Sequence, residues 1–461
     1  MRTMARATQK ICLIFLLMSS ILLGIGYSIG SPESHNLGQI IKPSNSDSWI
    51  RILKNGDRSS KLEIYNNSLY VIGYYTGHIS KFDASGYLLW EYPLNIYRPS
   101  YVIDTNGSLL IVSESPSQNE LSLVKLSSSG TLLYSKNVLL GSISYDSSLT
   151  LVENDSIILT AHSYQEEKLC IFKFNSIGDL LWNTSISARY FDIYPRIVSD
   201  SKHNFYIPHY NNDVYVAKVN STGQLLWQIE FSYLNSISNL MIDDNDTLFL
   251  IGANYSDTSI FKINSSGSIL TELVINDFST SLGYNWLFDD MIIMTEYYPL
   301  ALYCYDADLN HKWNYNLSDY VFPYYRQLVN LARDSQGNIN ILQSNRAADI
   351  SLIKINSTGH HISQIIWGSS DAELLGSSLL DSDDNLFFLC HCVYYDRWRR
   401  RLEYTVLVKN PRNGGVPPVP VRTLEFKDYF LFSVLGVGSI ISILSLITIL
   451  RGRNKIASLK R

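Results

Sequence analysis

The sequence predicts an all-β chain built from eight four-stranded units, and three observations support this prediction. A motif of the form K-h-N/D-S-S/T-G-x-L-L-W, in which h is an apolar residue, recurs along the chain. A strand-like run introduced by Asp, Asn or Gly precedes each copy by 20 to 30 residues. Between residues 49 and 410 no segment has the 3.6-residue apolar period of a helix. A repeat of fixed period therefore decides the architecture.

The spacing of the motif defines the eight units. The turn glycine, or the residue in its place, recurs every 42 to 55 residues. These turn positions are Gly86, Gly130, Gly178, Gly223, Gly267, Leu309, Gly359 and Gly414. Apolar and alternating runs predict four strands in each unit, and in the second unit they cover residues 101–104, 109–113, 122–126 and 132–138.

Four-stranded units of about 40 to 45 residues are typical of β-propeller blades, which pack radially and need no helices. The eighth unit lacks an outer strand after Asn410, whereas residues 48–53 (SWIRIL) precede the first unit and resemble the L-L-W strand of the others. We therefore predict an eight-bladed β-propeller of four-stranded blades, closed by pairing 48–53 with 402–409. The alternative is a seven-bladed ring in which the degenerate unit around Leu309 forms an insertion.

Both ends of the chain are predicted to be membrane-related. Residues 1–30 combine a basic start with the apolar run ICLIFLLMSSILLGIGYSI, which indicates a signal peptide, or an N-terminal anchor if uncut. A polar linker follows at 31–47, the propeller occupies 48–410, and 411–428 is a Pro-rich juxtamembrane linker. Residues 429–450 carry no charge and predict a transmembrane helix about 33 Å long. Residues 451–461 form a basic tail.

The charge distribution predicts an extracellular propeller. The net charge is −5, but the two ends hold eight of the 37 basic residues and no acid, which leaves 29 basic against 42 acidic residues, or −13, in 11–450. The positive-inside rule places the basic tail in the cytoplasm, so we expect a single-pass protein of the cell membrane. Nucleic acid is not an expected partner, since phosphate neutralisation needs basic surface.

The motif K-h-N/D-S-S/T-G-x-L-L-W after a D-x-x-G-N-h-h-h strand resembles the β-propeller repeat of exported microbial proteins, which is related to the quinoprotein-like (PQQ-like) propellers. The resemblance covers about 360 of the 461 residues and concerns the fold. Quinoprotein enzymes space the Asp and Gly of their tryptophan-docking motif four apart, whereas Asp83 and Gly86 are three apart, and their adjacent Cys pair is missing here. The resemblance therefore implies no catalytic residue and no cofactor.

Two residue types recur with the repeat and are predicted to be structural. Lys stands five residues before the turn position in seven units, as Lys81, Lys125, Lys173, Lys218, Lys262, Lys354 and Lys409. One interpretation is a cationic ring for an anionic ligand; the favoured one is a stem packed between blades with the amine reaching solvent. The recurring tryptophans are expected to pack between blades, and they are Trp90, Trp182, Trp227 and Trp313.

Candidate metal ligands fall in two kinds of place. Cys390 and Cys392 flank His391, but strand alternation would point the thiols one way and the imidazole the other, so a shared site is not expected. Asp-rich turns at 381–385 and 243–246 have the closely spaced oxygens that Ca²⁺ uses, although Asp and Asn also favour turns for geometric reasons. No G-x-S-x-G, H-E-x-x-H, P-loop or Rossmann motif occurs, so no catalytic or metal residue is predicted.

Ten N-x-S/T sequons make the chain a candidate glycoprotein if it is exported. Three of them arise from the turn sequences NSTG and NSSG, which are favourable turns in their own right. The ten asparagines are Asn66, Asn106, Asn154, Asn183, Asn220, Asn245, Asn254, Asn264, Asn316 and Asn356.

A long hairpin in the last unit is the candidate binding element. Tyr, Trp and Arg are enriched in binding hot spots, and four Arg within five positions form a basic patch on an acidic domain. The competing interpretation is a membrane-facing hairpin that meets anionic head groups. The hairpin VYYDRWRRRLE (393–403) contains Tyr394, Tyr395, Arg397, Trp398, Arg399, Arg400 and Arg401.

The predicted function is a membrane-anchored cell-surface propeller that binds or scaffolds an extracellular protein, a glycan or an envelope component. The alternative is an exported propeller enzyme that acts on polysaccharide or by quinone-linked oxidation. The two differ at the central channel. An acidic cluster lined by loops at its mouth would favour an enzyme, and an apolar, plugged channel would favour binding.

Overall fold

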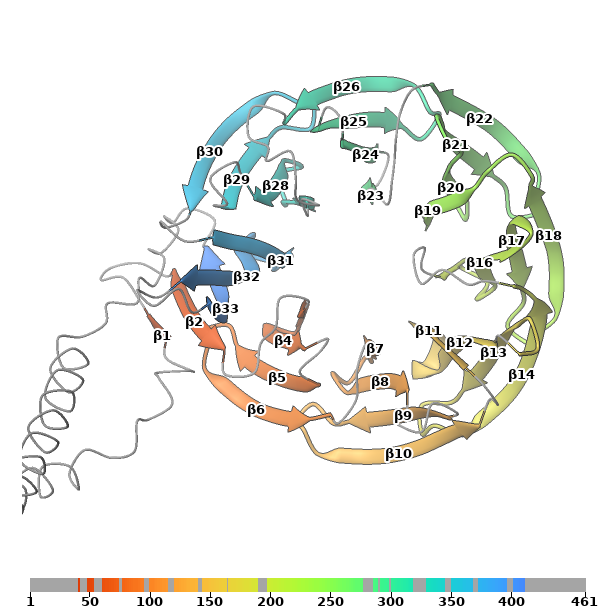
Figure 1. Cartoon of the computed structure of the whole chain (residues 1–461), viewed down its shortest axis with the longest axis horizontal. Helices are drawn as coiled ribbons and strands as arrows, with labels where there is room; N and C mark the ends of the chain where they lie inside the picture. Colours follow the sequence, from red (N-terminus) through yellow and green to blue (C-terminus); the bar gives the residue numbers. More distant parts are fainter. Residues whose placement is uncertain are drawn as a thin grey trace, which may run out of the picture. The chain divides into compact units, whose positions relative to one another are not determined.

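The structure is a computed structural model, and its described residues all belong to the first of two compact units, Met1–Pro418. They form a closed ring of eight antiparallel sheets (Figure 1). The described residues are 40–41, 48–53, 60–73, 77–94, 99–114, 120–139, 143–163, 165–189, 197–276, 285–288, 291–297, 300–317, 329–344, 350–367, 372–395 and 401–410.

Seven of the sheets are blades of four strands in sequence order, and the eighth combines strands from both ends of the ring. The predicted eight-bladed, all-β propeller is confirmed. Blade 1 contains β3 (Lys61–Tyr65), β4 (Ser68–Ile72), β5 (His78–Asp83) and β6 (Leu88–Pro93), and blade 2 contains β7 (Ser100–Ile103), β8 (Leu109–Glu114), β9 (Glu120–Leu126) and β10 (Leu132–Leu139). Blade 3 contains β11 (Ile143–Leu151), β12 (Ile157–Ser163), β13 (Lys168–Phe174) and β14 (Leu180–Ser187). Blade 4 contains β15 (Val198–Ser199), β16 (Phe205–Asn211), β17 (Asp213–Val219) and β18 (Leu225–Phe231).

The four strands predicted for the second unit begin and end within two residues of the observed strands β7 to β10. Blades 5 to 7 continue the pattern of blades 1 to 4. Blade 5 contains β19 (Ser236–Ile242), β20 (Leu248–Ala253), β21 (Thr258–Ile263) and β22 (Ile269–Ile275). Blade 6 contains β23 (Asn285–Phe288), β24 (Met291–Tyr297), β25 (Leu300–Asp306) and β26 (His311–Asn316). Blade 7 contains β27 (Val329–Arg333), β28 (Ile339–Ser344), β29 (Ile350–Ile355) and β30 (His361–Trp367).

Blade 8 joins the two ends of the ring, as the sequence predicted. It contains β31 (Ala372–Leu380), β32 (Leu386–Tyr395) and β33 (Arg401–Asn410), and its outer strand is β2 (Trp49–Leu53). β2 pairs with β33 from Trp49 opposite Lys409 to Leu53 opposite Thr405, so the closing strand is confirmed. A short strand, β1 (Ile40–Ile41), adds a fifth strand outside β2.

The seven-bladed alternative is wrong, because the degenerate unit around Leu309 forms blade 6. Leu309 takes the left-handed conformation of the turn glycine, with φ of 66°, and is buried. Space for its side chain exists because blade 5 has Thr271 at a position where six of the other seven outer strands carry an aromatic ring. Leu309 therefore fills the volume of the missing ring, and Leu273 of blade 5 packs into the same cluster.

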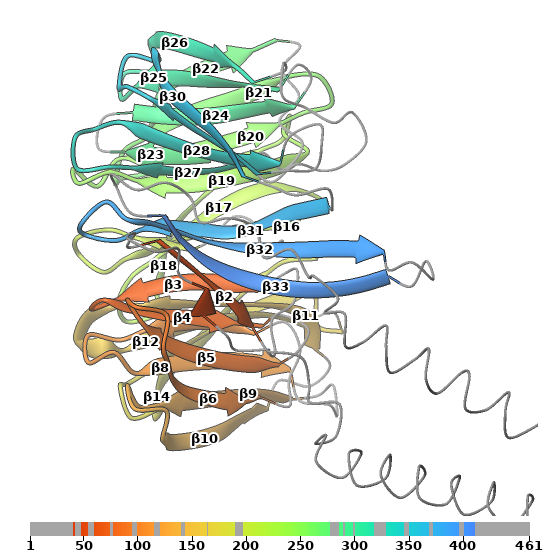
Figure 2. The same ribbon diagram turned by 90° about the vertical axis from the view of Figure 1, so that its left-hand side faces the viewer.

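The meander gives the ring two different faces. In every blade the first strand lies near the central channel and the fourth strand forms the outer edge (Figure 1). Turns between strands 1 and 2 and between strands 3 and 4 share one face, which we call the turn face. Hairpins between strands 2 and 3 and the connections between blades share the opposite face, which we call the crossover face (Figure 2).

The predictions for residues 1–39 and 411–461 lie outside the described residues, and so do those for the linker at 42–47. Within the part of the chain that the structure describes, no helix is long and apolar enough to cross a membrane.

Candidate functional site

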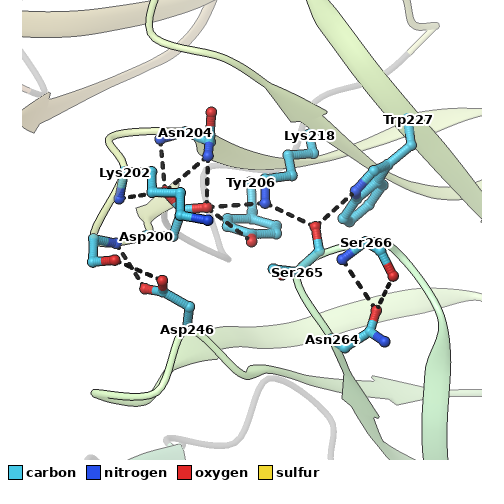
Figure 3. Close-up of polar contacts among 11 residues, drawn as sticks. Asp200, Lys202, Asn204, Tyr206, Lys218, Trp227, Asp246, Asn264, Ser265 and Ser266 are labelled. Atoms are coloured by element: carbon cyan, nitrogen blue, oxygen red, sulfur yellow. Dashed lines mark hydrogen bonds and ion pairs between the residues drawn. The ribbon is translucent and has the colours of Figure 1, made fainter.

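The repeat motif builds one contact between neighbouring blades, shown for blades 4 and 5 in Figure 3. The backbone carbonyl of Ser265, in the turn of blade 5, accepts hydrogen bonds from Lys218 Nζ at 2.9 Å and Trp227 Nε1 at 3.2 Å. Both donors belong to blade 4, where they stand opposite each other in the register. Lys218 also pairs with Asp200 Oδ2 at 2.9 Å and lies 4.7 Å from the centre of the Tyr206 ring. The motif therefore joins blades through a shared acceptor.

The turn glycine is required at this contact for two reasons. Gly267 has φ of 88°, a conformation that side chains other than glycine rarely adopt. A Cβ at this residue would also lie 3.0 Å from the Trp227 ring of blade 4. The same approach of an aromatic ring recurs at Gly86, Gly130, Gly178, Gly223 and Gly359. The predicted packing of the tryptophans between blades is confirmed.

The lysine amines do not reach solvent in the way that was expected. Lys81, Lys125, Lys173 and Lys218 are buried, and each amine donates to a turn carbonyl of the next blade. Besides the carbonyl, Lys125 and Lys218 pair with an Asp carboxylate, Lys173 pairs with Glu153, and the Lys81 amine lies 4.8 Å from the centre of the Tyr70 ring. These partners replace water, so the whole side chain can be enclosed. A cationic ring open to a ligand is therefore wrong for these four lysines.

Two of the paired aspartates have pKa values held below the ordinary range. Burial alone would raise the pKa of Asp200, but hydrogen bonds from Asn204 and Lys218 outweigh it and lower the pKa. Asp334 behaves in the same way, with burial opposed by hydrogen bonds from Lys354 and Asn338. Both carboxylates are thus charged members of the scaffold at neutral pH.

A second contact between blades, which the sequence reasoning missed, links the inner turns. Asp246 of blade 5 accepts hydrogen bonds from the backbone N–H of Ser201 at 2.7 Å and from its hydroxyl at 2.6 Å. Asp384 binds Ser335 in the same way. This contact has a sequence signal that would have indicated it. The signal is a D-S or D-T pair in one inner turn and, one repeat later, an Asp at the left-handed position of the next inner turn.

The turn face also contains a pocket of about 910 Å³ between the inner turns of blades 2 to 5. Six carboxylates line it, and most of them already have partners in the scaffold. Glu153 pairs with Lys173, Asp155 accepts from the Thr105 hydroxyl at 2.7 Å, and Asp246 binds Ser201. The lining carboxylates are Glu153, Asp155, Asp200, Asp243, Asp244 and Asp246. The pocket is acidic and open, and its geometry is largely set by contacts between blades.

The Asp-rich turns use their first aspartate for turn geometry. Asp243 Oδ1 accepts the backbone N–H groups of Asn245 and Thr247, and Asp381 Oδ1 accepts those of Asp383 and Asn385. In the residues that the structure describes, no three His, Cys, Asp or Glu side chains come together as metal ligands would. Calcium at these turns stays a prediction.

Cys390 and Cys392 point to one side of β32 and His391 to the other, as alternation predicted. The two sulfur atoms are 3.9 Å apart and buried, whereas His391 Nδ1 contacts the Thr405 hydroxyl at 3.2 Å. The imidazole and the thiols therefore do not share a site.

The ten sequon asparagines lie on the surface, and none of them is buried. Seven stand on the turn face: Asn66, Asn106, Asn154 and Asn245 in the inner turns, and Asn220, Asn264 and Asn356 in the outer turns. Asn254 lies on the crossover face, and Asn183 and Asn316 lie in outer strands.

The candidate hairpin of blade 8 connects the two longest strands, of ten residues each. Residues 396–400, with Arg397, Trp398, Arg399 and Arg400, lie outside the described residues, and only the backbone is described for Tyr394, Tyr395 and Arg401. On the crossover face, β32 and β33 reach beyond the strands of the other blades (Figure 2). Asn410, where the chain leaves the ring, is at the opposite end of β33, about 30 Å away at 3.3 Å per residue.

No protein-family model and no curated protein matches the chain. Solved structures similar to it include virginiamycin B lyase from Staphylococcus aureus, at 12% identity and TM-score 0.41, covering 80% of this chain and 98% of that one. AztD from Citrobacter koseri has 11% identity, TM-score 0.45 and coverage of 71% and 93%. The dihydro-heme d1 dehydrogenase NirN has 14% identity, TM-score 0.47 and coverage of 67% and 65%. Likeness at this level concerns the fold alone.

Proposed function

We propose that the protein is a membrane-anchored, cell-surface propeller that binds an extracellular protein, a glycan or an envelope component through the crossover face of blade 8. The observation that carries this proposal is the position of the 393–403 hairpin. Its two strands extend past the other blades, and Tyr395 and Arg401, which pair where β32 ends and β33 begins, are at the end of β33 away from Asn410. The two strands therefore carry the hairpin sequence to the face opposite to Asn410.

The residue types of the hairpin favour a partner over the membrane as its target. The Tyr, Trp and Arg residues in 393–403 suit a contact with a protein or a glycan. The contacts between blades supply a rigid support, which is the usual arrangement for a binding loop.

Export, anchoring and glycosylation complete the proposal and rest on the sequence. The apolar run in 1–30, the uncharged segment 429–450 and the surface position of the sequons support an extracellular, glycosylated ring. The motif also supports a relationship to exported microbial repeat propellers of the PQQ-like class. Anchoring is tested by alkaline extraction of membranes, which should leave the full chain in the pellet and release a variant that lacks 429–450.

The binding role is tested with the full chain in detergent micelles and a variant in which Arg397, Arg399, Arg400 and Arg401 are glutamine. Vesicles with and without anionic lipid and the isolated cell envelope serve as separate binding targets. We expect the arginine variant to lose envelope binding at least tenfold while its melting temperature stays unchanged. Equal binding by both proteins would contradict the proposal, and loss confined to anionic vesicles would assign the hairpin to the membrane.

An exported propeller enzyme is the second candidate, and the acidic pocket on the turn face is the observation that favours it. Paired carboxylates at a channel mouth could serve acid–base chemistry on a polysaccharide. Asp244 is the exposed carboxylate of that pocket, and Asp244→Asn should then abolish turnover without changing stability. Quinone-linked oxidation is excluded if the purified chain neither takes up the quinone nor alters its absorption.

A further inference from the structure

Blade 8 contains two thiols that the repeat does not require. Cys390 and Cys392 lie in β32, the second strand of the blade, and are 0% and 1% exposed. Their sulfur atoms are 3.9 Å apart. The second strands of blades 1 to 7 contain no cysteine. The thiol pair is therefore a feature of this blade and not of the propeller repeat.

The two thiols point into the interface between blades 7 and 8. Strand alternation places Phe388, Cys390 and Cys392 in one row of β32. The Phe388 ring contacts the Trp367 ring of blade 7, with ring centres 5.4 Å apart. Leu375, which stands opposite Cys390 on β31, is buried as well. Because apolar side chains surround the thiols and keep water out, the protein itself must supply the ligands of any group bound there.

A buried hydroxyl lies on the same face of blade 8. Ser378 of β31 stands opposite Phe388, which makes it a diagonal neighbour of Cys390, and it is 8% exposed. Its Oγ has no hydrogen-bond partner in the part of the chain that the structure describes. A buried hydroxyl is unfavourable until it finds an acceptor. A thiolate at Cys390 would supply that acceptor, so the hydroxyl is an independent indication of a ligand site.

The separation of the sulfur atoms fits one shared metal ion. Two thiolates that each bind an ion at about 2.3 Å are 3.9 Å apart when the sulfur–metal–sulfur angle is about 116°. A disulfide fits less well. Residues i and i+2 of a strand have Cα atoms about 6.7 Å apart, at the upper limit for a disulfide, so the strand would have to contract. Among the described residues no His, Asp or Glu joins the two thiols, which favours an ion of low coordination number.

We infer that Cys390 and Cys392 bind one Cu(I) ion, with the Ser378 hydroxyl donating a hydrogen bond to the Cys390 sulfur. Soft thiolate ligands select Cu(I), whereas structural Zn²⁺ sites have four ligands. On binding, each thiol loses its proton to solvent and its sulfur forms a bond to copper, and no electron is transferred. The site uses β31 and β32 and none of the side chains of 396–400, so it does not depend on the proposed function.

The test is titration of the full chain in detergent micelles with Cu(I), kept reduced by ascorbate, in competition with the chelator bicinchoninate. We expect one bound Cu(I) per chain, thiolate-to-copper absorption in the near ultraviolet and a higher melting temperature. Cys390→Ala and Cys392→Ala should each lose the bound ion. Ser378→Ala keeps both thiols and should weaken binding about tenfold. Cys304→Ala is the matched control, because Cys304 is a buried thiol of blade 6, and it should bind like the unmodified chain.

Melting temperatures without copper show whether each variant folds, and if one alanine variant of the pair does not, the other is used. Alkylation without reductant, followed by intact mass, shows whether the two thiols are reduced. Four results would overturn the inference: no binding by the unmodified chain, undiminished binding by Cys390→Ala, a Cys390–Cys392 disulfide in the isolated chain, or binding of Zn²⁺ in place of Cu(I). Envelope binding is measured on the same variants, which keep the hairpin arginines, so the two proposals can fail independently.

Discussion

Truncation of Trp49 to alanine should destabilise the whole ring, because this side chain closes blade 8 against blade 1. Trp49 is 1% exposed, its ring lies against Gly86, and its Nε1 donates to the Ala84 carbonyl at 3.3 Å. Removing a buried tryptophan costs about 3 to 5 kcal/mol, and the lost hydrogen bond adds about 1 kcal/mol. A domain of about 360 residues has an unfolding entropy of about 0.76 kcal/mol/K, so a loss of about 5 kcal/mol lowers the melting temperature by about 7 °C.

The assay is thermal unfolding of the full chain followed by circular dichroism. Leu270→Ala is the matched control, since Leu270 is a large apolar residue of another outer strand but is 54% exposed. The control should change the melting temperature by less than about 1 °C. A change below about 2 °C for Trp49→Ala would refute the role of β2 as the closing strand. Deletion of residues 48–53 should have a larger effect than the single substitution.

Three further predictions concern the ring. Thr271→Trp alone should destabilise blades 5 and 6, because Leu309 occupies the space that the new ring would need. Adding Leu309→Gly should restore stability. Denaturant unfolding of the two single variants and the double variant should then give a coupling free energy above about 1 kcal/mol. Gly223→Ala should cost more than Gly337→Ala, since both have φ near 80° but only the first Cβ would lie within 3 Å of a tryptophan ring; equal losses would contradict this. Burial lowers the pKa of His209 to about 4, so as the pH falls the unfolded chain binds a proton at this residue before the folded chain does. Up to about 3 kcal/mol of the free energy of unfolding should therefore be lost between pH 6.5 and pH 4. In His209→Gln this part of the pH dependence should disappear.

The repeat could be read from the sequence because its signals are local. The turn glycine, the preceding Asn or Asp and the strand alternation all act within one blade, and Asp83 Oδ1, for example, caps its own turn by accepting from Ser85 and Tyr87. The missing outer strand of the last unit was also visible, because 48–53 carries the side chains of an outer strand. The partners of the lysines were not predictable in the same way. The Ser265 carbonyl and Lys218 are 47 residues apart, and nothing in either segment indicates burial of the amine.

The sequence by itself determined the number of blades, the strand that closes the ring and the positions of the turns, because each depends on a period or a short-range pattern. Only the tertiary structure decided what those residues do to their neighbours. The lysine and tryptophan of one blade share a carbonyl of the next, and Leu309 replaces a ring that blade 5 lacks. Such relations join residues a full repeat apart, and they exist only once the blades are packed side by side.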